Sequence, residues 1–423
     1  MNPRDLLLGS FRAALGAADP LAIVPAHLPQ PPRGRTLVVG AGKAAASMAL
    51  AVERHWPAQS ALEGLVITRY GHGLPLSRIR VVEAGHPVPD EHGEAAAREI
   101  LGLASALGPD DLLLVLVSGG GSSLLSFPVA GVPMADLKKV TRDLLASGAP
   151  IQDMNTVRKH LSVIQGGKLA LATKARVLAL VISDVTGDDP THIASGPTVP
   201  DPTTYADAIE ILERFAVTAP PSIAAHLARG ASGAIAETPK PGDPAFARVD
   251  NRVIATAHAS LTAAADYMRE HAVTPLVLGD SVTGESAEVA KVYAALAREV
   301  RLHDLPIKPP VALISGGETT VTLRKSGRGG RCSEFLLSLA VSLEGLADTW
   351  ALACDTDGID GSEDNAGAIL TPDALARARA AGLAPKRMLA DNDSYGFCAA
   401  LGDLVVTGPT RTNVNDFRII MVR

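Results

Sequence analysis

The chain has 423 residues, more than a single hydrophobic core usually serves, so its length predicts two or three domains. Aromatic residues make up only 3% of it, which leaves few rings on which single-stranded nucleic acid could stack. The net charge of -6 arises from mixed signs without a Lys/Arg run, which argues against nucleic acid or a membrane surface as a partner.

The first twenty residues predict an amphipathic helix rather than a signal peptide. Leu6, Leu7, Phe11 and Leu15 fall on one face at helical spacing, and Asp5 comes early in a segment that has no long apolar core. The chain has three cysteines, an odd number without the pairing of metal ligands, which suits a reduced compartment. We therefore expect a cytoplasmic protein.

Apolar runs in the first half of the chain predict parallel strands joined by helices. They stand at 36–40, 64–68, 79–84, 111–119 and 176–184 and alternate with Ala-rich stretches. Their near-continuous hydrophobicity indicates that both faces of the sheet are covered. The expected fold is α/β, with a first domain built on a Rossmann-like, mostly parallel sheet that has helices on both faces.

A change of composition divides the chain. Residues 216–250 are rich in Pro, Ala and Gly, which indicates either a linker or a peripheral helix pair. A second series of apolar runs follows, and we predict an N-terminal domain over 1–240 and a C-terminal α/β domain over 241–423. The runs of the second series stand at 251–257, 274–280, 309–318, 349–358 and 403–408.

Glycines and a lysine follow the first predicted strand. Gly40 and Gly42 end this strand, and Lys43 precedes a helix that opens with small residues. Backbone N–H groups at such a helix start attract anions, and the lysine adds a charge for a phosphate. The segment is neither a full dinucleotide fingerprint nor a Walker-type loop, and a tight turn with a solvated lysine is the alternative.

The strand at 111–119 ends in three glycines, Gly119, Gly120 and Gly121, followed by Ser122 and Ser123. Consecutive glycines permit positive φ and a close backbone approach, and the hydroxyls add donors, so a phosphate nest is expected. Open α/β sheets bind ligands at this end of a central strand. A flexible loop would use the same residues and is the competing interpretation.

Polar residues at 154–162 and 181–204 supply further candidates. Asn155 and Arg158 are three apart and share a helical face that could reach one anion, although a solvated cationic face is the alternative. Asp184, Asp188 and Asp189 follow the strand at 176–184, where carboxylates can hold Mg²⁺ or accept a proton from a hydroxyl. Asx turns would account for one or two of them, and Asp184 is the best single candidate.

The second half places charged and polar residues at strand ends in the same way. Glu318 ends one apolar run, and Arg331 follows four residues of which three are glycine, at a predicted helix start. A guanidinium group there is suited to a carboxylate or phosphate. Asp357 lies at the end of the run at 349–358, where the downstream Glu of a calcium loop is absent. Thr410 and Asn413 follow the last run and are expected near a ligand, with turn formation as the competing interpretation.

Taken in chain order, eight of these segments resemble the glycerate 2-kinase family, whose C-terminal domain is of the MOFRL type. The segments are VGAGKAA, VSGGGSSLL, MNTVRKHLS, SDVTGDDPTHIASGPTVPD, SGGETTVT, GRGGR, TDGIDG and TGPTRTNVND, from about residue 36 to 416. The resemblance implies two α/β domains with the active site in the cleft between them. It also implies ATP as phosphoryl donor, Mg²⁺, and D-glycerate phosphorylated at its 2-hydroxyl. A monomer or a homodimer is expected.

The resemblance also implies roles for individual residues. The positions that match the family's active-site set are Lys43, Asp184 or Asp188, Glu318, Arg331, Asp357 and Asn413. As catalytic residues we expect Lys43, Asp184 and Arg331, with the two cations on phosphates or on the glycerate carboxylate, and acidic residues on magnesium or on the attacking hydroxyl. The candidate metal ligands are Asp188 and Asp189. The residues expected to contact substrate or nucleotide, from their own pattern or from the resemblance, are Gly42, Gly119, Gly120, Gly121, Ser122, Asn155, Arg158, Glu318, Asp357, Thr410 and Asn413.

The sequence departs from the family pattern in three places. Cys332 and Ser333 stand where Asn-Gln is usual, Arg411 replaces a usual Gly, and SEDNAGA at 362–368 varies the run that usually follows TDGIDG. An added arginine could alter the choice of hydroxy acid, so a kinase of a related small hydroxy acid is one alternative.

Two other classes of function compete with the kinase. A hydroxypyruvate reductase could hold a dinucleotide at the first glycine loop. It would need an acidic residue after the second strand, where Arg69 and Tyr70 stand instead, which counts against NAD but leaves a phosphate-bearing cofactor open. A non-catalytic binder of sugar acids is the second competitor.

Overall fold

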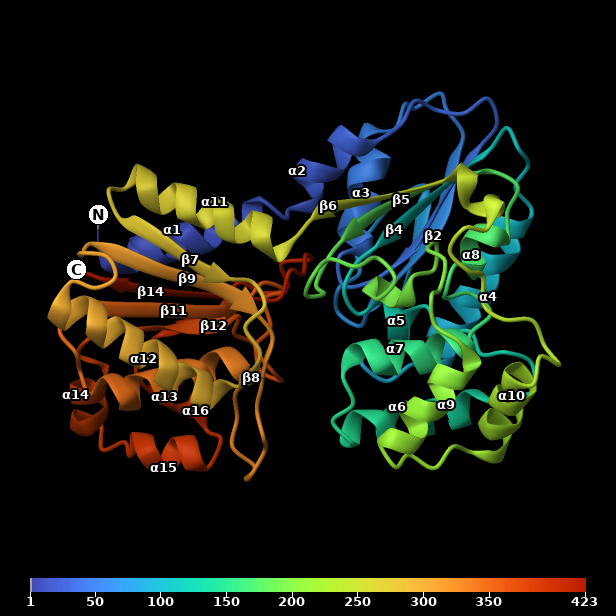
Figure 1. Cartoon of the computed structure of the whole chain (residues 1–423). Helices are drawn as coiled ribbons and strands as arrows, with labels where there is room; N and C mark the ends of the chain where they lie inside the picture. The colour runs from blue at the N-terminus through green and yellow to red at the C-terminus, as the bar shows by residue number, and fades with distance from the viewer. Residues whose placement is uncertain (1) are drawn as a thin grey trace. The chain divides into compact units, whose positions relative to one another are not determined.

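The computed structural model describes residues 2–423, which divide into two compact units (Figure 1). The first unit is Pro20–Ile254, and the second combines residues 2–19 with Ala255–Arg423. The sequence had suggested a division at residue 240. The structure differs because the N-terminal helix packs in the second unit, and because the strand after residue 248 completes the first sheet.

The first unit is built on a six-stranded sheet in the order β3-β2-β1-β4-β5-β6. The pairs β3–β2, β2–β1, β1–β4 and β4–β5 are parallel, as predicted. This is the strand order of dinucleotide-binding folds. The strands are β1 (Thr36–Ala41), β2 (Leu62–Arg69), β3 (Ile79–Ala84), β4 (Leu112–Val117), β5 (Arg176–Ile182) and β6 (Val249–Ala255).

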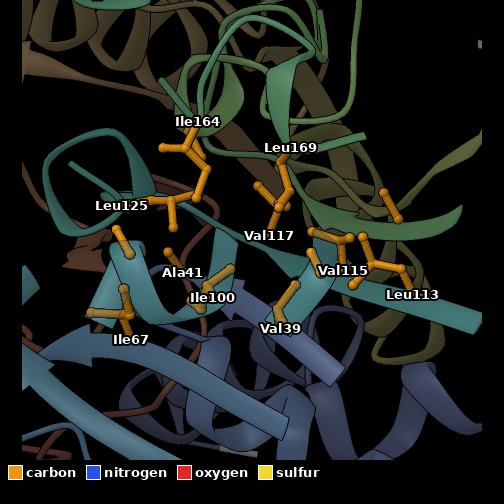
Figure 2. Packing of buried hydrophobic residues seen from close by; sticks show 14 of the residues in the cluster. Val39, Ala41, Ile67, Ile100, Leu113, Val115, Val117, Leu125, Ile164 and Leu169 are labelled. Carbon is orange, nitrogen blue, oxygen red and sulfur yellow. The ribbon is translucent and has the colours of Figure 1, made fainter. Parts of the chain in front are cut away.

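Helices cover both faces of this sheet. On one face, alternate residues of β1 and β4, such as Val39 and Val115, pack with Ile100 of α4 and with Ile164 and Leu169 (Figure 2). The buried residues of α3 lie outside this cluster and pack against β1, β2 and β4. The first helices are α2 (Pro20–Ile23), η1 (Val24–His27), α3 (Ala45–His55), α4 (Glu91–Ser105) and α5 (Gly121–Leu124). The expected α/β class is confirmed.

A group of four helices in the same unit has its own apolar core. Leu137, Val157, Ile211 and Leu227 are among the residues that form it. From the sequence, residues 216–250 were interpreted as a linker or a helix pair. In the structure they contribute one α-helix to this group, whose buried residues Ile223 and Leu227 are four apart, one helical turn. The remaining helices of the unit are α6 (Met134–Ala146), α7 (Ile151–His160), α8 (Lys168–Leu171), η2 (Ile193–Ser195), α9 (Tyr205–Arg214), α10 (Pro221–Ala231) and η3 (Pro244–Arg248).

A buried ion pair fixes the end of α7. Lys159 Nζ donates to Asp201 Oδ1 at 2.8 Å, and both side chains are almost completely buried. The buried imidazole of His160 contacts the Thr156 carbonyl through Nδ1 and Glu237 through Nε2. Because both ring nitrogens have protein partners, His160 has a structural role rather than that of a base.

The second unit contains a six-stranded sheet in the order β13-β12-β11-β14-β9-β7. Only the pair β7–β9 is parallel among the five neighbouring pairs. The sequence reading missed β12, a strand of only four residues, and also the buried, central β14, because it followed the chain only as far as Asp416. The strands are β7 (Thr274–Gly279), β9 (Val311–Gly317), β11 (Thr349–Asp355), β12 (Gly367–Leu370), β13 (Leu404–Val405) and β14 (Asp416–Val422).

Helices cover both faces of the second sheet as well (Figure 1). The predicted N-terminal helix is confirmed as α1 (Pro3–Gly16), which packs against α11 and buries Leu6, Leu7 and Phe11. The helices are α11 (Ala257–Glu270) on the α1 side, and α12 (Ser286–His303), α13 (Arg331–Leu343), α14 (Ala374–Ala380), α15 (Pro385–Ala390) and α16 (Ser394–Ala400), whose residues pack in the other core. Two-residue strands β8 (Gly284–Glu285) and β10 (Thr319–Thr320) pair separately.

Within residues 2–423, no single helix is long and apolar enough to cross a membrane. The bent pair formed by Pro3–Gly16 and Pro20–His27 is together long and apolar enough to cross one, by length and composition only. The apolar face of its first helix is already buried in the core of the second unit.

Candidate active site

The turns after β1 and β4 lie side by side, because these strands are parallel neighbours in register from Thr36 to Ala41. The strand order reverses between them, and open α/β sheets bind ligands at such a point. The Lys43 N–H donates to the Gly119 carbonyl at 2.9 Å, and the Ala44 N–H donates to Ser118 Oγ at 3.0 Å. The predicted glycine turns therefore form one connected loop pair.

Gly120 has a φ of 79°, in the left-handed region that favours glycine. A Cβ at this position would lie 2.9 Å from the His86 ring and 3.6 Å from Lys43 Cγ. The structure therefore brings His86, from the turn after β3, to the glycine loop beside Lys43. The sequence reading missed His86 because only the pairing of β3 with β2 brings that turn to the same edge of the sheet.

Ser122, Asn155 and Arg158 also come together, as the spacing of the last two suggested. Ser195 Oγ lies 2.9 Å from Ser122 Oγ and 3.0 Å from Asn155 Oδ1, and Arg158 Nη1 donates to Asn155 Oδ1 at 3.3 Å. Burial lowers the pKa of Arg158 to about 10. Asn155 Nδ2 donates to the His192 carbonyl at 2.9 Å, so the Asn155 amide holds the loops around the glycines together.

Replacing Gly121 with Ala is expected to destabilise the protein by about 1–3 kcal/mol through overpacking. The added Cβ would lie 2.5 Å from Ala194 Cβ and 2.9 Å from the Ala41 carbonyl, neither of which is a flexible side-chain end. Gly102→Ala is the control, since it adds a methyl group in open space within α4 and should stabilise by about 0.5–1 kcal/mol. Denaturant unfolding would measure both. Equal effects at the two sites would contradict the tight packing of the loop.

The acidic loop after β5 contains Asp184, Asp188 and Asp189. Asp189 Oδ1 accepts the Thr191 N–H at 2.8 Å, which is the Asx turn considered from the sequence. Burial alone would raise the pKa of Asp189, but the hydrogen bonds from Thr191 lower it below its ordinary value. Asp188 has a φ of 54° and closes a turn onto the Val185 carbonyl. Asp184 stands two residues beyond the end of β5 and is half-buried.

In the second unit, one arginine is held by three carboxylates. Arg331, the first residue of α13, donates through Nε to Asp416 Oδ1 at 2.7 Å, through Nη1 to Glu318 Oε1 at 2.6 Å and through Nη2 to Asp355 Oδ2 at 2.8 Å. Burial alone would lower the pKa of Arg331, but the three carboxylates raise it well above its ordinary value. Glu318 and Arg331, both candidates from the sequence, are thus in direct contact.

The sequence reading did not select Asp355 and Asp416 as site residues. Both lie at the ends of antiparallel neighbours, and Asp355 is in register with Asp416. In the sequence, Asp355 stands next to the polar segment TDG and Asp416 is the last residue of TNVND, but the pairing of the strands was needed to place both on Arg331. Their side chains are 6% and 0% exposed, whereas that of Glu318 is 54% exposed.

The start of α13 is fixed by a buried carboxylate. Asp360 accepts the N–H groups of Cys332 and Ser333 at 2.9 and 2.8 Å, and burial raises its pKa despite these bonds. Cys332 and Ser333, which depart from the family pattern, are both buried inside the second unit. Cys332 belongs to the apolar core, and Ser333 Oγ lies 2.9 Å from Ser394 Oγ.

Two neighbouring loops contain Asp357, Thr410 and Asn413. The Thr410 N–H donates to the Asp357 carbonyl at 3.0 Å, and Asp357 Oδ1 accepts the Ile359 N–H at 2.9 Å. Asn413 is buried, and its Oδ1 accepts the Asn415 N–H at 3.4 Å. Arg411 adopts a φ of 60°, in the region that favours the glycine usual at this position.

Two family models match separate parts of the chain. A family described as a domain of unknown function (DUF4147) matches residues 6–228, and the MOFRL family matches residues 311–416. A protein from Agrobacterium vitis that is provisionally named a hydroxypyruvate reductase is 51% identical, over 100% of this chain and 95% of its own.

Two glycerate kinases are similar over nearly the whole chain. The glycerate 2-kinase of Pyrococcus horikoshii is 39% identical, over 92% of this chain and 88% of its own. The crystal structure of glycerate kinase from Thermotoga maritima has a TM-score of 0.87 and 36% identity, and the match covers 99% of both chains. On this likeness in sequence, fold and length, the chain belongs to the glycerate kinase family.

Proposed function

We propose that this protein is a glycerate 2-kinase, which transfers the γ-phosphoryl group of ATP to the 2-hydroxyl of D-glycerate and forms 2-phosphoglycerate and ADP. The observation that carries the proposal is Lys43, which follows a glycine turn at the reversal of strand order and is bonded to the second glycine loop. Phosphoryl transfer depends on positioning and on neutralising negative charge, and this loop pair suits both.

In the first unit, the turns after β1 and β4 would bind phosphate oxygens. Lys43 supplies a point charge, and the backbone N–H groups of the loop from Gly119 to Ser122 supply donors at the start of a helical turn. We assign Asp184 to the attacking hydroxyl, as the acceptor of its proton. Gly42, with a φ of 141°, allows the chain to turn sharply before Lys43.

In the second unit, Arg331 would bind the glycerate carboxylate or a phosphate. Asp416 and Asp355 are buried and hold two of its nitrogens, while Glu318 is the exposed partner of the third. A substrate anion can replace Glu318 at Nη1 without disturbing the buried contacts, and the guanidinium group remains in place. We assign Asp357, Thr410 and Asn413 to the nearby substrate contacts.

Mg²⁺ typically takes one or two carboxylates together with waters and substrate phosphates. Among residues 2–423, no group of three or more His, Cys, Asp or Glu side chains is arranged to hold a metal ion. The adjacent carboxylates of Asp188 and Asp189 fit the smaller protein share that a nucleotide-bound Mg²⁺ requires. We propose that they hold this ion, which would neutralise charge on the transferred phosphoryl group.

A reductase is the second candidate, because the Rossmann strand order and the name of the Agrobacterium vitis relative favour it. The residues at the end of β2 argue against a reductase that uses NAD. Arg69 is the last residue of that strand, and the Tyr70 hydroxyl donates to Asp90 Oδ2 at 2.7 Å and lies 2.9 Å from His92 Nδ1. The acidic residue that would bind the ribose of NAD is therefore missing from its usual place.

Product analysis separates the candidates. The purified full chain, incubated with ATP, Mg²⁺ and D-glycerate, is expected to form ADP and a product that enolase accepts without added mutase. Parallel reactions contain hydroxypyruvate with NADH or NADPH. Absence of ADP above background, together with reduction of hydroxypyruvate, would overturn the kinase. Binding of D-glycerate in calorimetry without any turnover would instead support a binding protein.

We also propose a cytoplasmic location. It rests on the three cysteines, which are all buried and unpaired, as suits a reduced compartment.

A further inference from the structure

One arginine lies entirely inside the second unit. Arg418, in the central strand β14, has no exposed surface, and its guanidinium carbon lies 5.5 Å from the centre of the Phe335 ring. Its Nη2 donates to Asp416 Oδ2 and, at 3.0 Å, to Thr319 Oγ1. Burying a cation costs free energy, and an apolar side chain of similar size would fill this space without that cost. The position of Arg418 therefore calls for a reason other than packing.

Arg418 is connected to Arg331 by two separate routes. In the first, the Asp416 carboxylate receives Arg331 Nε on Oδ1, at 2.7 Å, and Arg418 on Oδ2. In the second, Thr319 Oγ1 lies 2.5 Å from Ser286 Oγ, which donates to the Arg331 carbonyl at 2.9 Å. One route ends on the side chain of Arg331 and the other on its backbone.

The charges around Arg331 explain why the first route needs a cation. Three carboxylates contact this arginine, and two of them, Asp355 and Asp416, are almost fully buried. Arg418 supplies a second positive charge to Asp416 from the interior. Without it, Asp416 would compete with Asp355 and Glu318 for the single guanidinium group of Arg331.

We propose that Arg418 is a positioning residue that holds Arg331 in its working orientation through Asp416 and through the Thr319–Ser286 pair. This inference rests on the proposed function, with the transferred phosphoryl group rather than the glycerate carboxylate as the anion that Arg331 binds. Arg418 itself is buried and does not touch substrate. A group that acts through another should affect the transition state more than ground-state binding, because small errors of orientation cost rate.

The test compares Arg418→Met and Arg418→Lys with Arg377→Met. Arg377 also pairs with a buried carboxylate of the second unit, Asp403, at 2.6 Å, and serves as the matched control. Arg418→Met is expected to lower kcat by about 100-fold with little change in KM for D-glycerate. Arg418→Lys keeps the charge but not the planar group whose Nη2 reaches both Asp416 and Thr319, so it should recover part of the loss. Arg377→Met should keep wild-type kcat.

A double-mutant cycle with Arg331→Met distinguishes positioning from a general loss of structure. If Arg418 acts through Arg331, adding Arg418→Met to Arg331→Met should cost little further rate. Multiplicative losses, or an unchanged kcat in Arg418→Met, would overturn the proposal. Where Arg418→Met fails to fold, Thr319→Val and Ser286→Ala cut only the second route. Both should lower kcat several-fold in a protein that stays folded at the assay temperature, and wild-type kcat in both would equally overturn it.

Failure of this inference can be told apart from failure of the proposed function. An inactive wild-type protein would refute the kinase activity, whatever the variants do. An active wild type that is impaired by Arg331→Met but unaffected by Arg418→Met would refute only the positioning role.

Discussion

Arg331→Met is expected to lower kcat for phosphoryl transfer by about 10³-fold, the order of loss seen when an arginine that neutralises a transferring phosphoryl group is removed. The reason is geometric as well as electrostatic. Asp416 and Asp355 fix two nitrogens of the guanidinium group, so it is preorganised before substrate binds. Steady-state kinetics with ATP and D-glycerate would measure the loss.

The neighbouring Arg328 provides the control for this substitution. It belongs to the same glycine-rich segment, but its side chain is 58% exposed and lies 3.6 Å from Glu363. Arg328→Met should leave kcat within about two-fold of wild type, since an exposed pair contributes little. Melting temperatures of both variants are needed, because Arg331→Met also leaves Asp355 without its arginine. A folded Arg331→Met protein with wild-type kcat would remove Arg331 from the site.

Lys43→Met is expected to lower kcat/KM for ATP by about 10²–10³-fold, because a single preorganised charge on a phosphate is worth roughly that much. The lysine backbone is fixed by its bond to the Gly119 carbonyl, and its Cγ approaches the position that a Gly120 side chain would occupy. Methionine keeps most of the length of the side chain and removes the charge together with the N–H donors. Initial rates over a range of ATP concentrations would separate kcat from KM.

Lys139→Met is the control for Lys43, since Lys139 is an exposed helix residue paired with Asp143. It should change neither rate nor affinity. Lys43→Arg is a second comparison, which keeps the positive charge but places a larger, planar group beside His86 and Gly120. A Lys43→Met protein that binds and uses ATP as the wild type does would show that the glycine loops act without the lysine.

The sequence by itself determined the parallel strands of the first unit and the residues that follow them. Continuous apolar runs predicted β1 to β5, because strands covered on both faces cannot alternate polar and apolar residues. Glycines at the ends of β1 and β4 predicted the loop pair around Lys43, because parallel strands place their carboxyl ends at one edge. The amphipathic pattern of α1 was equally clear, since its spacing is local.

Only the tertiary structure decided where distant residues meet. The pattern of α1 does not say which sheet its apolar face covers, and the structure places it in the second unit. Arg331 and Asp416 are 85 residues apart, and only the pairing of β14 between β11 and β9 brings them into contact. The charges on Arg331 and Arg418 could be read from the sequence, but strand order and register decide which carboxylates neutralise them.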